Sequence, residues 1–255
     1  MRKVSFFFRL PCLATLLILT YATANAGQVY VAVAANFTPA AKEIATAFDK
    51  KTGHRAILSF GSTGKLYTQI INGAPFEIFL SADQKHPKLT IEQGFAIKNT
   101  RFTYAAGHLV LYSADEQLID KSVDILRAAT FRKIAIANPK TAPYGRAAQE
   151  VMVNLNVLDA VQSQIVRGDN IAQTYQFVAT GNAELGFVAL SQVIGHKAGS
   201  RWIVPTGLYA PLKQDVVLLK TSKNNTVASA FFTFLKSPDA AAIIKKYGYT
   251  LGKLK

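Results

Sequence analysis

The chain has little cysteine, glycine and proline, and it has few acidic side chains. Cys12 is the single cysteine among 255 residues, which excludes an internal disulfide and a cysteine-rich zinc site. The 16 Gly and 9 Pro are too few for a low-complexity or collagen-like chain. Half of the residues are hydrophobic, so the chain can form a packed core and is not intrinsically disordered.

The shortage of acidic residues leaves a strong positive charge. There are 29 Lys and Arg against 15 Asp and Glu, which gives a formal net charge of +14. Such a charge favours anionic partners, namely nucleic acid, acidic membranes or small anions. The basic residues are spread along the chain and form no run with interleaved aromatic residues, so we expect no nucleic-acid partner.

The first 26 residues have the layout of a secretory signal peptide. The basic residues that open it are Arg2, Lys3 and Arg9. A mostly apolar run follows over 10–21, and Ala24-Asn25-Ala26 supplies small residues at the positions that a signal peptidase reads. Cys12 lies at the start of this run and follows Pro11 rather than a small residue, which argues against a lipoprotein signal. Cleavage after Ala26 would remove three basic residues and leave 229 residues with a net charge of +11.

Strand and helix patterns alternate along the rest of the chain. Short apolar runs predict strands over 29–34, 56–60, 76–80, 108–112, 133–137, 185–189 and 215–219. Caps and helical spacing predict helices from about 38 to 48, 65 to 72, 141 to 155 and 171 to 179. Two more helices finish the chain, and the last of them ends at Gly248. This order is typical of an α/β protein with parallel strands. The length favours two lobes, with lobe I formed by 27–105 plus 216–255 and lobe II, inserted into it, by 106–215.

Four turns combine a strand end with a helix start. They are Ala35-Asn36-Phe37, Gly61-Ser62-Thr63-Gly64, Ala142-Pro143-Tyr144-Gly145 and Asp169-Asn170-Ile171. Open α/β sheets bind ligands at the carboxyl ends of their strands. The N–H groups that begin a helix have no partner inside it and favour an anion. Two turns belong to each expected lobe, so closure would gather their donors around one point.

Each of these turns also has a purely structural interpretation. Asn36, Ser62 and Thr63 are all residue types that cap helices. Tyr144 would then only pack against the next helix, and Asn170 would only shape a turn. None of the four patterns is specific by itself, and their joint placement is what favours a binding site.

Other motifs have less support. Gly61 to Lys65 is similar to a nucleotide phosphate loop, but Ser59 stands where that motif needs its first glycine. The four histidines lack the spacing of a zinc site. Ser62 has no histidine at a motif-like distance, so a hydrolase triad has no sequence support. Arg167-Gly168-Asp169 matches an adhesion tripeptide by three letters only.

Several longer motifs carry a resemblance to a known family. They read V-A-V-A-A-N-F, S-F-G-S-T-G-K-L, S-A-D, N-P-K-T-A-P-Y-G, E-L-G-F-V-A-L-S-Q and S-P-D-A-A-A-I-I-K-K-Y-G-Y. Through essentially the whole mature chain, the sequence resembles the periplasmic molybdate-binding proteins, the substrate-binding components of molybdate ABC transporters. The resemblance implies a two-lobed type II periplasmic binding protein fold, with mainly parallel sheets, flanking helices and a ligand cleft between the lobes.

The resemblance also implies a function and a set of contacts. A periplasmic, non-enzymatic and, we expect, monomeric protein would hold molybdate or tungstate by hydrogen bonds alone, with no cofactor and no direct metal ligand, and deliver it to an inner-membrane ABC permease. The implied contacts are Ala35, Asn36, Ser62, Tyr144 and, through its backbone N–H, Ile171. Many members have Ser at the position of Asn36, and some have a contacting Tyr at the position of Ala189, a role that Tyr144 would fill here.

The chemistry of the turns favours the same kind of ligand. A fully ionised oxyanion only accepts hydrogen bonds, so its site should consist of donors. Phosphate still carries a proton at neutral pH and would need an acceptor, and Asp169 is the only carboxylate in the four turns. Binding of sulfate, phosphate or another small anion therefore remains an alternative. An exported phosphoester hydrolase with Ser62 as nucleophile, or adhesion through Asp169, has less support.

Overall fold

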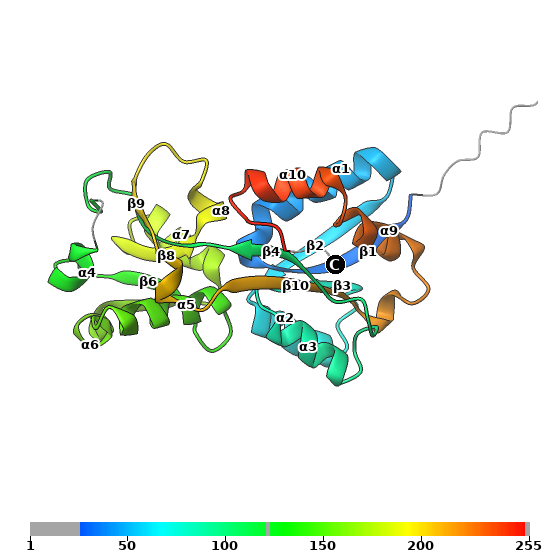
Figure 1. Cartoon of the computed structure of the whole chain (residues 1–255), viewed down its shortest axis with the longest axis horizontal. Helices are drawn as coiled ribbons and strands as arrows, with labels where there is room; N and C mark the ends of the chain where they lie inside the picture. Colours follow the sequence, from blue (N-terminus) through cyan, green and yellow to red (C-terminus); the bar gives the residue numbers. More distant parts are fainter. Residues whose placement is uncertain (1–25, 121–122, 253–255) are drawn as a thin grey trace, which may run out of the picture.

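The protein is described here by a computed structural model that covers residues 26–120 and 123–252. The predicted signal peptide, apart from Ala26, lies outside these residues. Figure 1 shows two lobes side by side, each with a sheet between layers of helices. The expected two-lobed fold is therefore confirmed.

The first lobe contains a five-stranded sheet in the order β2-β1-β3-β10-β4. Its strands are β1 (Gln28–Ala34), β2 (Arg55–Gly61), β3 (Ile78–Leu80), β4 (Phe102–Gly107) and β10 (Leu212–Leu218). The pairs that β1 forms with β2 and β3 are parallel, whereas β10 runs antiparallel to both β3 and β4. The sheet is mixed because the chain enters and leaves the other lobe through β4 and β10.

Helices cover both faces of this sheet because side chains alternate along its strands. Val29, Val31 and Val33 of β1 pack with α1 (Thr38–Thr52), α9 (Thr226–Phe234) and α10 (Pro238–Lys246). Ala32, on the opposite face, packs with α2 (Thr63–Ile71) and lies on the side of α3 (Lys85–Glu92). Gly53 ends α1 in the left-handed conformation, with a φ of 71°, as glycine commonly does at the end of a helix.

The second lobe repeats this plan with the sheet order β7-β6-β8-β5-β9. Its strands are β5 (Leu109–Ser113), β6 (Ile134–Ala137), β7 (Ile165–Gly168), β8 (Leu185–Ala189) and β9 (Ser200–Ile203). Its helices are α4 (Asp124–Ala128), α5 (Pro143–Asn154), α6 (Leu158–Val161), α7 (Ile171–Ala179) and α8 (Leu190–Val193). β6 is parallel to β7 and β8, and β5 is antiparallel to β8 and β9. Short 3₁₀ helices complete the chain as η1 (Ala35–Phe37), η2 (Gln162–Gln164), η3 (Thr206–Leu208) and η4 (Lys220–Ser222).

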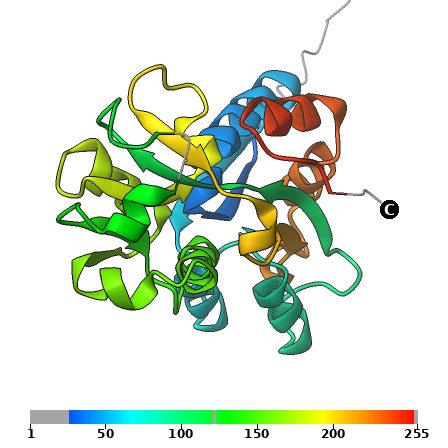
Figure 2. The same ribbon diagram turned by 60° about the vertical axis from the view of Figure 1, so that its left-hand side comes forward.

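Two segments link the lobes, one between β4 and β5 and one between β9 and β10 (Figure 2). The second lobe is thus inserted between two strands that are neighbours in the first sheet. The boundaries that we expect at 105/106 and 215/216 fall inside β4 and β10, so the first sheet extends a few residues beyond each.

Within residues 26–120 and 123–252, no single helix is long and apolar enough to cross a membrane. The pair α9 and α10, bent by 58° at the break between them, meets the criteria of length and composition only when the two are taken together. In the same ranges, no three His, Cys, Asp or Glu side chains are grouped so that they could hold a metal ion.

Candidate functional site

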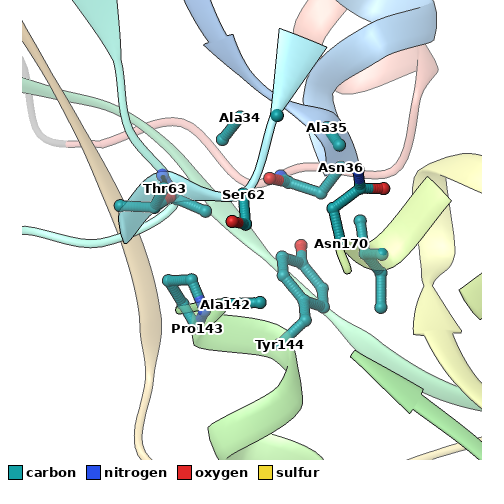
Figure 3. A pocket seen from close by; sticks show the side chains of 12 residues that line it. Ala34, Ala35, Asn36, Ser62, Thr63, Ala142, Pro143, Tyr144 and Asn170 are labelled. Atoms are coloured by element: carbon teal, nitrogen blue, oxygen red, sulfur yellow. Dashed lines mark hydrogen bonds between the residues drawn. The ribbon is translucent and has the colours of Figure 1, made fainter. Parts of the chain in front are cut away.

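A small cavity lies where the four turns meet between the lobes (Figure 3). Its lining residues are Ala34, Ala35, Asn36, Gly61, Ser62, Thr63 and Ala82 from the first lobe, and Ala142, Pro143, Tyr144, Asn170 and Ile171 from the second. Each turn follows the carboxyl end of a parallel strand, because β1, β2, β6 and β7 all end at this cleft. The structure therefore brings together all five residues that we predict for the site, although their contact with a ligand stays a prediction.

Ser62 lies before the first residue of α2, where a serine usually caps a helix. Its side chain makes no capping hydrogen bond, and its backbone is extended, with a φ of −70° and a ψ of 146°. The hydroxyl is buried and, in the described part of the chain, Oγ has no hydrogen-bond partner. A buried unpaired hydroxyl costs about 1–3 kcal/mol, and a ligand oxygen in the cavity would satisfy it.

Asn170 occupies the corresponding position before α7 but does cap its helix. Its Oδ1 accepts hydrogen bonds from the N–H groups of Ala172 and Gln173, at 2.9 and 3.1 Å. These are the second and third N–H groups of the helix, so the cap leaves the first one, that of Ile171, for another acceptor. The structural interpretation is thus correct for the Asn170 side chain, and the backbone of Ile171 remains the candidate donor.

The Asn36 side chain is committed to the first lobe. Its Nδ2 donates to Gln214 Oε1 at 2.9 Å and to the Tyr249 hydroxyl at 3.1 Å. An amide nitrogen has two hydrogens, so this group has no donor left for a ligand. Neither the 3₁₀ helix η1 nor α1 is capped by a side chain. The Asn36 side chain therefore stabilises the turn through hydrogen bonds to the first lobe. The donor that Asn36 can offer to the cavity is its backbone N–H.

Tyr144 projects from the start of α5 across the cleft. Figure 3 shows its hydroxyl pointing toward Asn36 and Ser62 of the other lobe. The ring is buried, and this burial raises the pKa of the Tyr144 hydroxyl well above its usual value. The hydroxyl therefore keeps its proton at neutral pH and can donate a hydrogen bond.

The sequence pattern does not reveal Gly107, which makes room for this hydroxyl. A Cβ atom at position 107 would lie 2.0 Å from the Tyr144 oxygen and 2.7 Å from Gln214 Nε2. Only glycine leaves space there for the hydroxyl to approach Gln214. Local sequence pattern cannot show this contact, because residues 107 and 144 belong to different lobes.

Among the residues that the structure describes, no carboxylate lines the cavity. Asp169 lies outside it, with 67% of its side chain exposed, and forms an ion pair with Lys65 at 2.9 Å. The residue that favoured a protonated oxyanion is thus not placed to accept a hydrogen bond from one. No histidine lines the cavity either, so Ser62 has no general base beside it for hydrolysis.

Contacts between the lobes surround the cavity. The Gly64 N–H donates to the Thr141 carbonyl at 2.8 Å, and the Ser191 hydroxyl donates to the Asn36 carbonyl at 2.8 Å. Arg146 also reaches across the cleft to Asp83, at 3.0 Å. Together with the Lys65–Asp169 pair, these contacts hold the lobes closed around the cavity.

The fold and this interlobe cavity define a solute-binding protein, and comparison with known proteins agrees. The family of bacterial extracellular solute-binding proteins matches residues 29–250, and the chain belongs to this family. Within it, the resemblance to the molybdate-binding proteins is confirmed. The chain is 53% identical over 226 residues to the molybdate-binding protein ModA of Rhodobacter capsulatus, covering 89% of each protein.

Further relatives support the same placement. The molybdate-binding protein ModA of Azotobacter vinelandii is 52% identical over 231 residues, which cover 89% of this chain and 92% of that protein. A solved structure of the periplasmic molybdate-binding protein from Azotobacter vinelandii superposes with a TM-score of 0.85 at 42% identity, covering 88% of this chain and all of that one. The sulfate-binding protein SubI of Mycobacterium tuberculosis has a TM-score of 0.71 at 14% identity, with 88% and 87% of the two chains covered, and shows the fold alone.

Proposed function

We propose that this chain binds molybdate, or the similarly sized tungstate, between its two lobes and delivers it to an ABC transporter permease. One observation carries the proposal: the cavity between the lobes is lined by hydrogen-bond donors, including the unpaired buried hydroxyl of Ser62, and by no carboxylate. Such a lining suits an anion that can only accept hydrogen bonds. The names of the relatives with about half of their residues identical point to the same cargo.

The donors in the cavity are sufficient for tight binding. We propose as donors the N–H groups of Ala35, Asn36 and Ile171 and the hydroxyls of Ser62 and Tyr144. Hydrogen bonds to a charged partner contribute roughly 1.5–3 kcal/mol each, so five give about 8–15 kcal/mol before the costs of ordering and closure. A net binding free energy of ~10 kcal/mol corresponds to a dissociation constant of tens of nanomolar. No cofactor and no direct metal ligand are needed for such a site.

Calorimetry on the mature chain tests this function. Titration with molybdate and with tungstate should each show one anion bound per chain, and sulfate should give little heat because it is too small to reach all the donors of a closed cavity. A molybdate titration without heat, and without a shift in the thermal unfolding midpoint, would exclude the proposed cargo.

Sulfate and phosphate are the alternative cargoes. Phosphate is disfavoured because it needs an acceptor and Asp169 faces solvent beside Lys65. Sulfate is fully ionised, as molybdate is, so only the size of the cavity distinguishes the two. Competition of each anion against bound molybdate decides between them.

The proposal extends to the location and the partner. We infer that the chain is exported to the periplasm, that it is cut after Ala26, and that it meets the permease as a monomer. The first residue of the exported protein, read by N-terminal sequencing, should be Gly27. A permease complex captured with the molybdate-loaded chain, and absent with a chain that has lost the site, tests the partner. Size-exclusion chromatography with light scattering tests the monomeric state.

A further inference from the structure

Four buried polar side chains lie behind the cavity on the side of the first lobe. We call them the polar cluster: Asn36, Tyr104, Gln214 and Tyr249, each at most 4% exposed. Gln214 belongs to β10, at a point where the register against β4 shifts between Gln214 and Asp215. Buried polar groups need partners, and here the partners determine where each hydrogen lies.

The assignment of hydrogens begins at the main-chain carbonyl of Asn36, which can only accept. The Tyr249 hydroxyl oxygen is 2.7 Å from this carbonyl oxygen, so the single hydroxyl hydrogen of Tyr249 lies between them. Toward the Asn36 side chain, 3.1 Å away, the Tyr249 oxygen can then only accept. The Asn36 amide must therefore present its nitrogen, Nδ2, to Tyr249.

The orientation of the Asn36 amide determines in turn which atom Gln214 presents to it. Asn36 Nδ2 donates its second hydrogen to Gln214 at 2.9 Å, so Gln214 must present its oxygen there. The Tyr104 hydroxyl, which also lies 3.0 Å from the Ser81 carbonyl, approaches the same Gln214 oxygen at 3.0 Å. With Oε1 held in this way, the Gln214 nitrogen Nε2 faces the Tyr144 oxygen at 3.4 Å.

An amide nitrogen only donates, so the Tyr144 oxygen accepts from Gln214 and its own hydrogen must point elsewhere. The Tyr249 hydroxyl oxygen is one acceptor near it, and an anion in the cavity would be the stronger one. Tyr144 lines the cavity, with its hydroxyl directed toward Ser62 (Figure 3). We propose that Gln214 is a positioning residue that makes the Tyr144 hydroxyl a donor to the bound anion, and so favours a fully ionised oxyanion over one that carries a proton. This inference rests on the proposed function of the cavity.

Gly107 supports the inference independently. The bare backbone at this position is what allows the Tyr144 hydroxyl and Gln214 Nε2 to approach each other, because a Cβ would overlap both. The contact between Tyr144 and Gln214, which belong to different lobes, therefore requires a glycine at the end of β4.

The test is a double-mutant cycle with Gln214→Glu and Tyr144→Phe, read by calorimetry with molybdate. A carboxylate at position 214 would accept from the Tyr144 hydroxyl and turn its hydrogen away from the anion. We expect Gln214→Glu to weaken molybdate binding at least tenfold more when Tyr144 is present than in the Tyr144→Phe background. The added charge acts in both backgrounds and cancels in this comparison. Gln149→Glu, at an exposed position of α5, controls for net charge.

Two further measurements keep the test decisive. Gln214→Met removes both polar atoms of the amide without adding a charge, so it should weaken molybdate binding about three- to tenfold, and the loss should be smaller in the Tyr144→Phe background, where only the effect of the lost Asn36 contact remains. Phosphate should compete better against molybdate in Gln214→Glu than in the unchanged chain. Equal losses in both backgrounds would show that Gln214 only packs, and would overturn the inference. Failure of the unchanged chain to bind molybdate would instead overturn the proposed function.

Discussion

Ser62 and Asn170 both stand before the first residue of a helix, and from the sequence both have the same two possible roles. The structure separates them: Asn170 caps α7 with its side chain, whereas the Ser62 hydroxyl is buried at the cavity and has no hydrogen-bond partner among the described residues. Asn36 has a third role, since its side chain serves the polar cluster. At the scale of the residue, the side-chain type predicts hydrogen-bonding capacity, and the neighbours decide where it is used.

Replacing these residues should therefore have opposite effects on stability and binding. Ser62→Ala should weaken molybdate binding by about 1–3 kcal/mol, because it removes one donor, without lowering the stability of the ligand-free chain. Asn170→Ala should lower stability by about 0.5–2 kcal/mol, because it removes a helix cap. Calorimetry and thermal unfolding measure the two quantities. Unchanged affinity in Ser62→Ala would mean that the cavity is not the binding site.

At the scale of the element, the strongest periodic patterns predict the structure well. The expected strands over 29–34, 56–60 and 185–189 correspond to β1, β2 and β8, and the helix over 171–179 corresponds to α7. The sequence does not predict β4, β7, β9 or α3, which lack a clear apolar period. All three strands lie at sheet edges, and they become strands by pairing with β10, β6 and β5, long-range interactions that local pattern does not encode.

The strand β4 supplies a test at this scale. Gly107→Ala should weaken molybdate binding at least tenfold, because the new methyl group would push the Tyr144 hydroxyl out of place. Gly207→Ala is the matched control, since no atom lies within 4 Å of a Cβ built there. Titration of both variants with molybdate gives the comparison, and equal affinities would contradict the role of Gly107.

At the scale of the whole molecule, Asp83 joins the two lobes. Burial acts to raise the pKa of this carboxyl, but the hydrogen bonds and charge of His86 and the hydrogen bond from Arg146 outweigh it and leave the pKa below its usual value. His86 Nδ1 lies 2.9 Å away in the same lobe, and Arg146 reaches over from α5. An ionised Asp83 thus contributes one ion pair to the closed arrangement.

A lowered pKa stabilises the folded state above the unfolded-state value and loses that contribution as the pH falls through the folded-state value. We therefore expect the thermal unfolding midpoint to drop as the pH falls below about 4, and Asp83→Asn to flatten this dependence. Unfolding measured from pH 6 to pH 2.5 tests it. Asp169→Asn is the control, because its ion pair with Lys65 is exposed and contributes ~0–1 kcal/mol. Parallel curves for Asp83→Asn and the unchanged chain would exclude this contribution.

The same Asp169→Asn variant tests the kind of anion that is carried. Because Asp169 lies outside the cavity, the substitution should change molybdate affinity by less than about threefold, well under one hydrogen bond to a charged partner. Calorimetry gives the result. A larger loss would place a carboxylate at the ligand and favour a protonated oxyanion.

The sequence by itself determined the alternation of strands and helices, the four donor-rich turns and the family, because these depend on residues close together in the chain. Only the tertiary structure decided which donors remain free for a ligand. Asn36 is 178 positions from Gln214 and 213 from Tyr249. Asp169 lies outside the cavity, in an ion pair with Lys65 of the other lobe. Hydrogen bonds act over a few ångströms, so their partners are settled only when packing brings distant segments together.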